Sequence, residues 1–240
     1  MLALLRLLQV FDSQFPVGAF AHSGGVETYA SLGGGLPELR EILVAQIALG
    51  WGRSELAAAH LAWRAAEKGD SPLFPVAADL EKGDSPLFGL GKGDSPLFRL
   101  AREVDALKVV PAVRNTSIGL GRRTLELLRR LYPDAAAIDV DPPHHAVVIG
   151  AAGRRLGIAA RDLLVAYGQS LAMGTLTAAL RCMPVSPAQA QGLLVEAHAH
   201  LVDAVERALA DPEGALFTCT PALDIRSHQQ AFLRTRLFQS

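Results

Sequence analysis

Apolar residues recur along most of this chain at intervals of three and four, the spacing that places them on one face of an α-helix. The clearest example follows Ser186, where Ser-Pro-Ala-Gln has the pattern of a helix N-cap with proline at the first helical position. Its apolar stripe consists of Leu194, Ala197, Leu201, Val205 and Ala208. This pattern predicts a helix that opens after Ser186 and ends near Ala210.

The same spacing predicts further helices, which prolines and glycines separate from one another. A first, short amphipathic helix has Leu4, Leu5, Leu8 and Phe11 on one face. The others are expected over residues 36–49 and 56–63 (two helices or one with a kink at Gly50), 99–110 and 118–132. Asp141 is the expected N-cap of another helix, with Pro142 at its first position.

Residues 163–180 carry no charge, and this run reaches the minimum length of a membrane span. Gln169, Ser170, Thr175 and Thr177 argue against a span, so we expect a helix buried on all sides in a bundle or a dimer. No run of β-branched or aromatic residues predicts a sheet. The fold class is therefore all-α: a single-domain multi-helix bundle over residues 1–240.

Composition and charge argue against several classes of function. Half of the residues are hydrophobic and the formal net charge is −1, which gives no field for nucleic acid or for an anionic membrane. Two cysteines cannot form a disulfide framework, and their spacing does not suggest zinc. The N-terminal run lacks a basic region and a cleavage site, so we expect a cytoplasmic protein without a signal sequence.

Residues 68–98 contain Lys-Gly-Asp-Ser-Pro-Leu-Phe three times, beginning at Lys68, Lys82 and Lys92. The spacing between copies is uneven, which excludes a solenoid. We interpret the segment as a surface insert of turns and short apolar anchors, with a triplicated docking motif as the alternative.

Three groups of residues are candidates for chemistry. Ser23 lies in an A-x-S-x-G pattern, but too few residues precede it to build the sheet of a hydrolase. Asp139, Asp141, His144 and His145 form a candidate cluster for a transient metal ion. A third group could supply an arginine to a GTPase, with a solvated basic face as the alternative; it comprises Arg122, Arg123, Arg154, Arg155, Arg234 and Arg236.

Several motifs resemble those of UreF, the urease accessory protein family. The first is Phe15-Pro-Val-Gly-Ala-Phe-Ala-His-Ser-Gly-Gly-Val-Glu27, here called the signature. In family order, the others include Lys108-Val-Val-Pro-Ala-Val-Arg114, His144-His-Ala-Val-Val-Ile-Gly150, Leu223-Asp-Ile-Arg-Ser-His228 and Arg236-Leu-Phe-Gln-Ser240. Gln229-Gln230 stands where the family usually has His-Glu.

The resemblance implies an all-α homodimer without catalysis, metal or cofactor of its own. It also implies a scaffold that binds UreD (also called UreH) and the GTPase UreG for nickel insertion into apo-urease. The alternatives are a regulator of the UreG GTPase and a direct nickel-carrying metallochaperone. The expected UreD-facing residues are Phe15, Pro16, His22, Ser23, Glu27, Asp224, Arg226, His228, Arg236 and Phe238, in the signature and in the partner-dependent tail, residues 219–240. The expected homodimer interface contains Tyr167, Gln169 and Met173.

Overall fold

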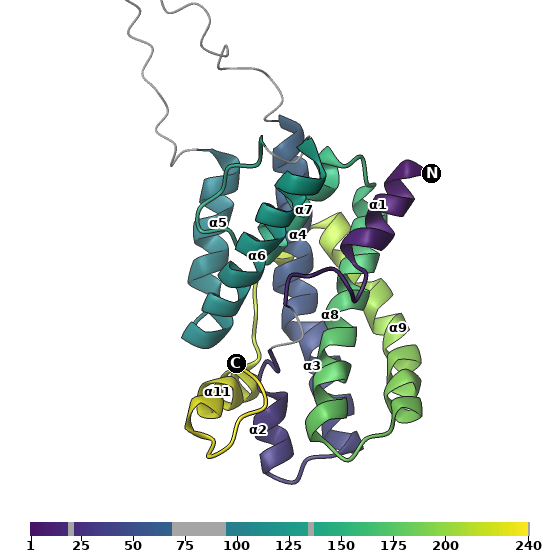
Figure 1. The fold of residues 1–240 in the computed structure, drawn as a ribbon, viewed down its shortest axis with the longest axis vertical. Helices are drawn as coiled ribbons and strands as arrows, with labels where there is room; N and C mark the ends of the chain where they lie inside the picture. Colours follow the sequence, from purple (N-terminus) through teal and green to yellow (C-terminus); the bar gives the residue numbers. More distant parts are fainter. Residues whose placement is uncertain (19–21, 69–94, 134–136, 240) are drawn as a thin grey trace, which may run out of the picture.

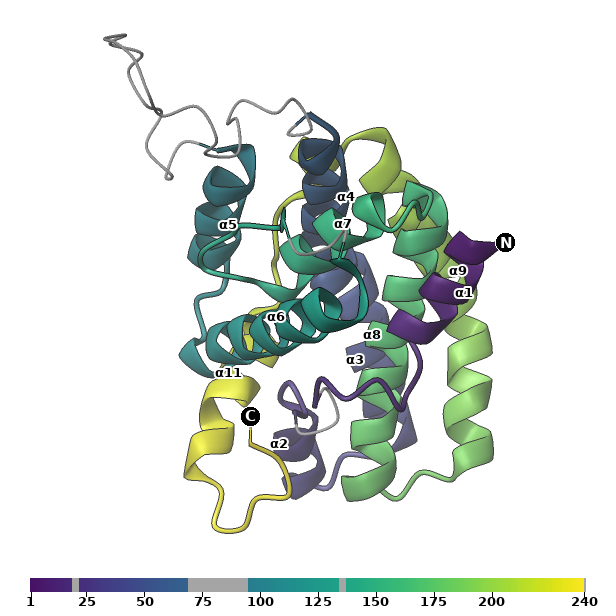
Figure 2. The ribbon, with the colours of Figure 1, turned by 45° about the horizontal axis from the view of Figure 1, so that its top comes forward.

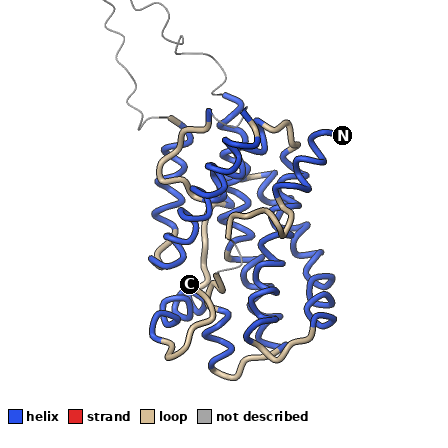
Figure 3. Tube along the Cα trace, in the orientation of Figure 1, coloured by secondary structure: helices blue, strands red, loops and turns tan. Residues whose placement is uncertain are grey.

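The computed structural model describes residues 1–18, 22–68, 95–133 and 137–239. These residues form helices joined by loops, with no strand among them (Figures 1 and 3). The helices are α1 (Leu2–Val10), α2 (Val26–Ser31), α3 (Leu36–Leu49), α4 (Trp51–Lys68), α5 (Pro96–Leu107), α6 (Pro111–Leu131), α7 (His145–Arg155), α8 (Ala160–Cys182), α9 (Pro187–Ala210), α10 (Pro212–Ala215), α11 (Pro221–Gln229) and the 3-10 helix η4 (Gln230–Phe232). The prediction of an all-α chain is confirmed.

Helices α4 and α7 pack closely at the centre of the bundle. Small side chains allow this approach, because Ala57, Ala58 and Ala59 of α4 are fully buried. A Cβ atom at Gly150 of α7 would overlap the carbonyl oxygen of Ala59. Alanine and glycine thus let two backbones meet, and the longer apolar side chains of α3, α8 and α9 fill the space around them.

Helices α8 and α9 lie side by side and antiparallel, and both views show α1 beside them (Figures 1 and 2). The predicted start of α9 is confirmed: the Ser186 hydroxyl accepts from Gln189 N, and Gln189 Oε1 accepts from Ser186 N. By length and composition, α8 could cross a membrane. Here it packs in the bundle through residues such as Leu164 and Leu176, which accounts for its apolar character.

Some sequence predictions were wrong in detail. Helix α8 is not buried on all sides, since Val165 is 52% exposed. The first helix buries Leu7 and Val10, whereas Leu4, Leu5 and Leu8 of the predicted stripe are exposed. Of that stripe only Phe11, directly after the helix, packs against the core.

Helix starts also differ from the predictions where prolines occur. Helix α7 begins at His145 rather than at Pro142, because Asp141 and Pro142 each precede a proline and are disfavoured in helical conformation. Helix α6 begins at Pro111 instead of Ile118, with the proline at its first position.

Most of the repeat-containing segment, residues 69–94, lies outside the described residues. The end of the third copy is described, and it opens α5. Ser95 caps this helix by accepting a 3.3 Å hydrogen bond from Phe98 N, and Pro96 occupies the first helical position.

Candidate functional site

The signature and the predicted tail, of which residues 219–239 are described and are here called the C-terminal segment, lie far apart in sequence. Buried and partly buried hydrogen bonds join them at a contact here called the junction. Gln230 Nε2 donates to Glu27 Oε2 at 2.8 Å, and the backbone N–H of Leu237 donates to Glu27 Oε1. The Ser23 hydroxyl donates to Gln230 Oε1 at 3.1 Å. Glu27 therefore fixes two turns of the C-terminal chain to the start of α2.

Backbone and ring contacts extend this junction. The Thr28 hydroxyl donates to the carbonyl oxygen of Arg226, whose guanidinium lies 5.6 Å from the centre of the Tyr29 ring. Gly25 has a φ of 93° and leaves room for Ser227, which a Cβ atom would overlap. Only glycine both adopts this positive φ readily and lacks the Cβ atom that would overlap Ser227.

Of the ten predicted partner-facing residues, the structure joins Ser23 and Glu27 to the C-terminal segment by hydrogen bonds, and only some of the ten are exposed. Ser23, Glu27 and Phe238 are buried, at 5%, 6% and 4% exposure, and hold the segment in place. These three side chains do not face a partner here, because the chain uses them for its own packing. The exposed residues are Pro16, His228 and Arg236, and the partly exposed ones are Phe15, His22, Asp224 and Arg226.

A cavity of about 250 Å³ lies next to this junction. Its walls come from the signature, from α3, α4, α5, α6 and α8, from His145 of α7, and from the segment that contains Thr218 and Asp224. Most of the sequence motifs thus converge on one space.

A buried ion pair stands in the cavity wall. Lys108 binds Glu55, and both side chains are 10% exposed. Burial alone would raise the pKa of Glu55, but the Lys108 ammonium outweighs burial and lowers that pKa below its usual value. Glu55 is therefore a carboxylate, and its second oxygen accepts a hydrogen bond from the Tyr167 hydroxyl at 3.2 Å.

His145 continues this network. Its Nδ1 lies 3.2 Å from the Tyr167 oxygen. Because the Tyr167 hydrogen points to Glu55, which only accepts, the hydrogen between Tyr167 and His145 belongs to Nδ1, and Nε2 carries a lone pair. Burial lowers the pKa of His145 to about 4, so the ring is neutral at physiological pH.

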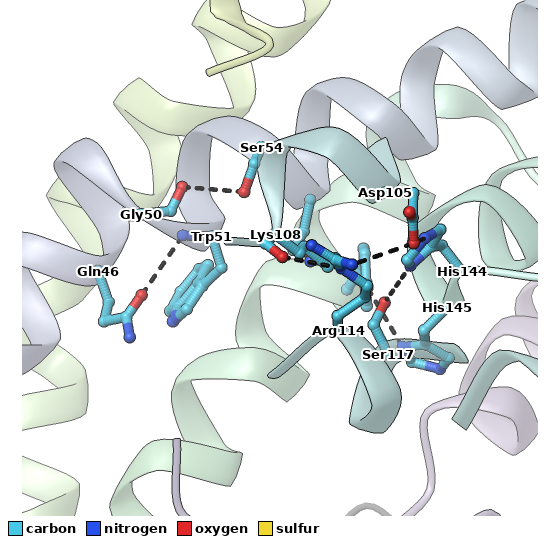
Figure 4. Close-up of polar contacts among 12 residues, drawn as sticks. Gln46, Gly50, Trp51, Ser54, Asp105, Lys108, Arg114, Ser117, His144 and His145 are labelled. Atoms are coloured by element: carbon cyan, nitrogen blue, oxygen red, sulfur yellow. Dashed lines mark hydrogen bonds and ion pairs between the residues drawn. The ribbon is translucent and has the colours of Figure 1, made fainter. Parts of the chain in front are cut away.

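A second row of polar residues ties α5, α6 and α7 together (Figure 4). His144 Nε2 lies 3.1 Å from Asp105 Oδ1, and His144 Nδ1 lies 3.1 Å from Ser117 Oγ. These residue types also occur in acyl-transfer triads, but Ser117 is inside helix α6 and His144 is fully buried. We therefore assign the row a structural role.

The candidate metal cluster named from the sequence is not formed. His144 faces Asp105, His145 faces Tyr167, and Asp139 and Asp141 are exposed on the preceding loop. Among the described residues, no three His, Cys, Asp or Glu side chains converge to hold an ion.

Comparison with known proteins agrees with this arrangement of motifs. The family model of UreF matches residues 37–198, more than half of the chain. The chain belongs to the UreF family.

Curated relatives named urease accessory protein UreF extend the similarity to both ends. One from Haemophilus influenzae (strain PittEE) is 27% identical over 98% of this chain and 94% of its own length. The relative from Nostoc sp. is 28% identical over 98% and 95%, and that from Actinobacillus pleuropneumoniae serotype 3 is 26% identical over 98% and 97%. The signature and the C-terminal segment, outside the matched part of the family model, thus fall within these full-length similarities.

The UreF motifs did not reveal every residue of the cavity. Glu55 and Asp105 were missed, because each looks like an ordinary charge on a helix. One signal was present for Glu55: it directly precedes the buried run Leu56-Ala-Ala-Ala59, where a charge needs a partner. Of the residues predicted for a homodimer interface, Tyr167 is enclosed within the protomer at 1% exposure, whereas Gln169 and Met173 are partly exposed.

Proposed function

We propose that the protein is a scaffold in urease maturation. In this role it holds a UreD-type (UreH-type) partner and the GTPase UreG together, so that nickel is inserted into apo-urease. Family membership supports the accessory role. The observation that carries the scaffold proposal is the union of the signature and the C-terminal segment in one junction, fixed by Glu27 and Gln230.

The surface of this junction has the composition of an interface. Ile225, Phe232 and Leu237 are 56%, 77% and 63% exposed, and Arg236 lies among them in sequence. Exposed aromatic and aliphatic side chains beside arginine are typical of residues that dominate binding energy. A UreD-type partner that covers them would remove this apolar area from water. The partly exposed Gln169 and Met173 of α8 remain our candidates for a homodimer interface.

Size exclusion with light scattering would test the proposal. We expect the purified chain to form a 2:2 assembly with UreD, which then captures UreG. Phe232→Ala should weaken capture of UreD without unfolding the chain, because the side chain is exposed. Val195→Ala, at a 67% exposed position of α9, is the matched control. A chain that ignores both UreD and UreG would contradict the proposal.

A further inference from the structure

The described walls of the central cavity carry one negative charge in excess. Their ionisable side chains are His22, Glu55, Lys108, His145 and Asp224. Glu55 and Lys108 neutralise each other as a buried ion pair. Burial lowers the pKa of both His22 and His145, so neither ring adds a positive charge at pH 7. Asp224 supplies the excess.

Asp224 has a partly buried carboxyl group without a partner for its charge in the described part of the chain. It lies in the first turn of α11, partly enclosed, and burial raises the pKa of its carboxyl group. Among the described residues, no side chain forms an ion pair with this carboxylate and no donor reaches it by a hydrogen bond. Partial burial without a partner disfavours the charged form of a carboxyl group, and such groups beside a cavity are candidates for ligand binding.

Several other groups in the walls are acceptors, whereas the buried Trp51 Nε1–H is a donor without a hydrogen-bond partner among the described residues. The Ser54 hydroxyl donates to Gly50 O, and the Thr175 hydroxyl donates to Leu171 O. Both hydrogens are thus used within the helices, which leaves the oxygen lone pairs free to accept. The His145 Nε2 lone pair is a further acceptor in this lining. A ligand that matches these walls has several N–H donors and a positive charge.

We propose that the cavity binds a guanidinium or alkylammonium group, with Asp224 as its counter-charge. A space of about 250 Å³ suits one such group on a short chain and is small for a nucleotide. The rings of Trp51 and Tyr167 in the walls favour a cation over a neutral amide. Guanidinium is the better fit of the two, because its five donors exceed the three of an ammonium.

Two sources could supply this cation: a free small guanidine or amine, or an arginine or lysine side chain of the partner. The second source rests on the proposed scaffold function, since the signature and α11 both contribute to the cavity walls and to the junction proposed to face UreD. Both sources share the same chemistry at Asp224.

Titration of the full-length chain with n-propylguanidinium, followed by calorimetry, tests the site. N-propylurea, a neutral molecule of similar shape, serves as the ligand control. We expect the cation to bind and the urea not to bind. Asp224→Asn should weaken binding by about tenfold or more, the usual effect of losing one charged hydrogen bond. Asp203→Asn, at an exposed position of α9, should leave it unchanged.

Loss of fold would not obscure this result. The asparagine side chain is close in size to that of aspartate, and the relief of a partly buried charge is offset by the loss of its interaction with the α11 dipole, so thermal unfolding of the Asp224→Asn variant should stay close to that of the wild type. Absence of n-propylguanidinium binding to the wild type, or equal binding by both aspartate variants, would overturn the proposal.

Capture of UreD by the same variants distinguishes the two sources. Weaker capture by Asp224→Asn, with n-propylguanidinium excluded from the wild-type complex, identifies a partner side chain. Unchanged capture, with the probe still bound in the complex, identifies a free cation. If the wild type captures UreD but binds no probe, the cation site is wrong while the scaffold stands. If the wild type binds the probe but does not capture UreD, the cation site stands and the scaffold proposal is wrong.

Discussion

Glu27 and Gln230, 203 positions apart, form a 2.8 Å hydrogen bond that is almost completely shielded from water. Glu27 also accepts from the backbone N–H of Leu237, so its carboxylate serves two donors of the C-terminal segment. One side chain of the signature thus binds the C-terminal segment at two points. This relationship explains why the two motifs form one surface.

Replacing Glu27 by Ala should release the C-terminal segment. The buried Gln230 amide and the partly buried Leu237 N–H lose their acceptor, at a cost of about 2–4 kcal/mol in the free energy of unfolding. Amide hydrogen exchange of Leu237 should become faster, while exchange in α9 changes little. Glu196→Ala, which breaks an exposed ion pair with Arg40, should leave the exchange of Leu237 unchanged. Equal exchange rates of the Leu237 amide in the wild type, Glu27→Ala and Glu196→Ala would show that Glu27 does not hold the C-terminal segment.

Gly121 should not tolerate a methyl group. A Cβ atom there would overlap the carbonyl oxygen of Pro143, where α6 meets the chain entering α7. Gly121→Ala should therefore destabilise the protein by about 3 kcal/mol or more, since backbone must move. Gly192→Ala on α9, where a Cβ meets nothing within 4 Å, should stabilise it by about 0.5–1 kcal/mol through helix propensity. Thermal unfolding followed by circular dichroism measures the melting temperature of both variants. A change of the same sign in both variants would contradict the predicted clash at Gly121.

Local patterns predicted the helices better than the cavity, for a physical reason. The start of α9 could be foreseen because Ser186 and Gln189 satisfy each other within one turn. The start of α7 could not, because two adjacent prolines changed the backbone that an Asp141 cap requires.

The pairing of Glu55 with Lys108 joins residues 53 positions apart, and nothing in the local pattern of either helix specifies such a partner. The signature and the C-terminal segment were predicted to share a surface, but the family resemblance alone indicated this. Burial of Ser23, Glu27 and Phe238 became clear only from their tertiary contacts.

The two tryptophans should respond differently to replacement by phenylalanine. Trp63 Nε1 donates to Ile158 O at 2.9 Å, and the Arg154 guanidinium lies 4.3 Å from the centre of its ring. Trp63→Phe should cost about 1–2 kcal/mol, because the carbonyl loses its donor and the ring attracts the cation less.

Trp51 is the matched control, since its buried Nε1 has no hydrogen-bond partner among the described residues. Trp51→Phe removes a similar volume but no hydrogen bond, so it should cost less than Trp63→Phe. Urea denaturation of both variants measures the difference. A larger loss at Trp51 would mean that its N–H has an acceptor outside the described residues.

Stability should fall as the pH drops from about 6.5 towards 4, and His145 should account for part of the loss. Burial holds its pKa at about 4 in the folded protein, below the usual value of 6.5. Between these values the unfolded chain binds a proton that the folded chain does not, which favours unfolding by up to about 3 kcal/mol at the acidic end. His145→Gln removes this difference, so the unfolding free energy of the variant should vary less with pH. His200→Gln, at an exposed position of α9, should retain the wild-type slope. Urea titrations at several pH values measure the three slopes, and identical slopes for wild type and His145→Gln would show that this ring does not titrate differently on folding.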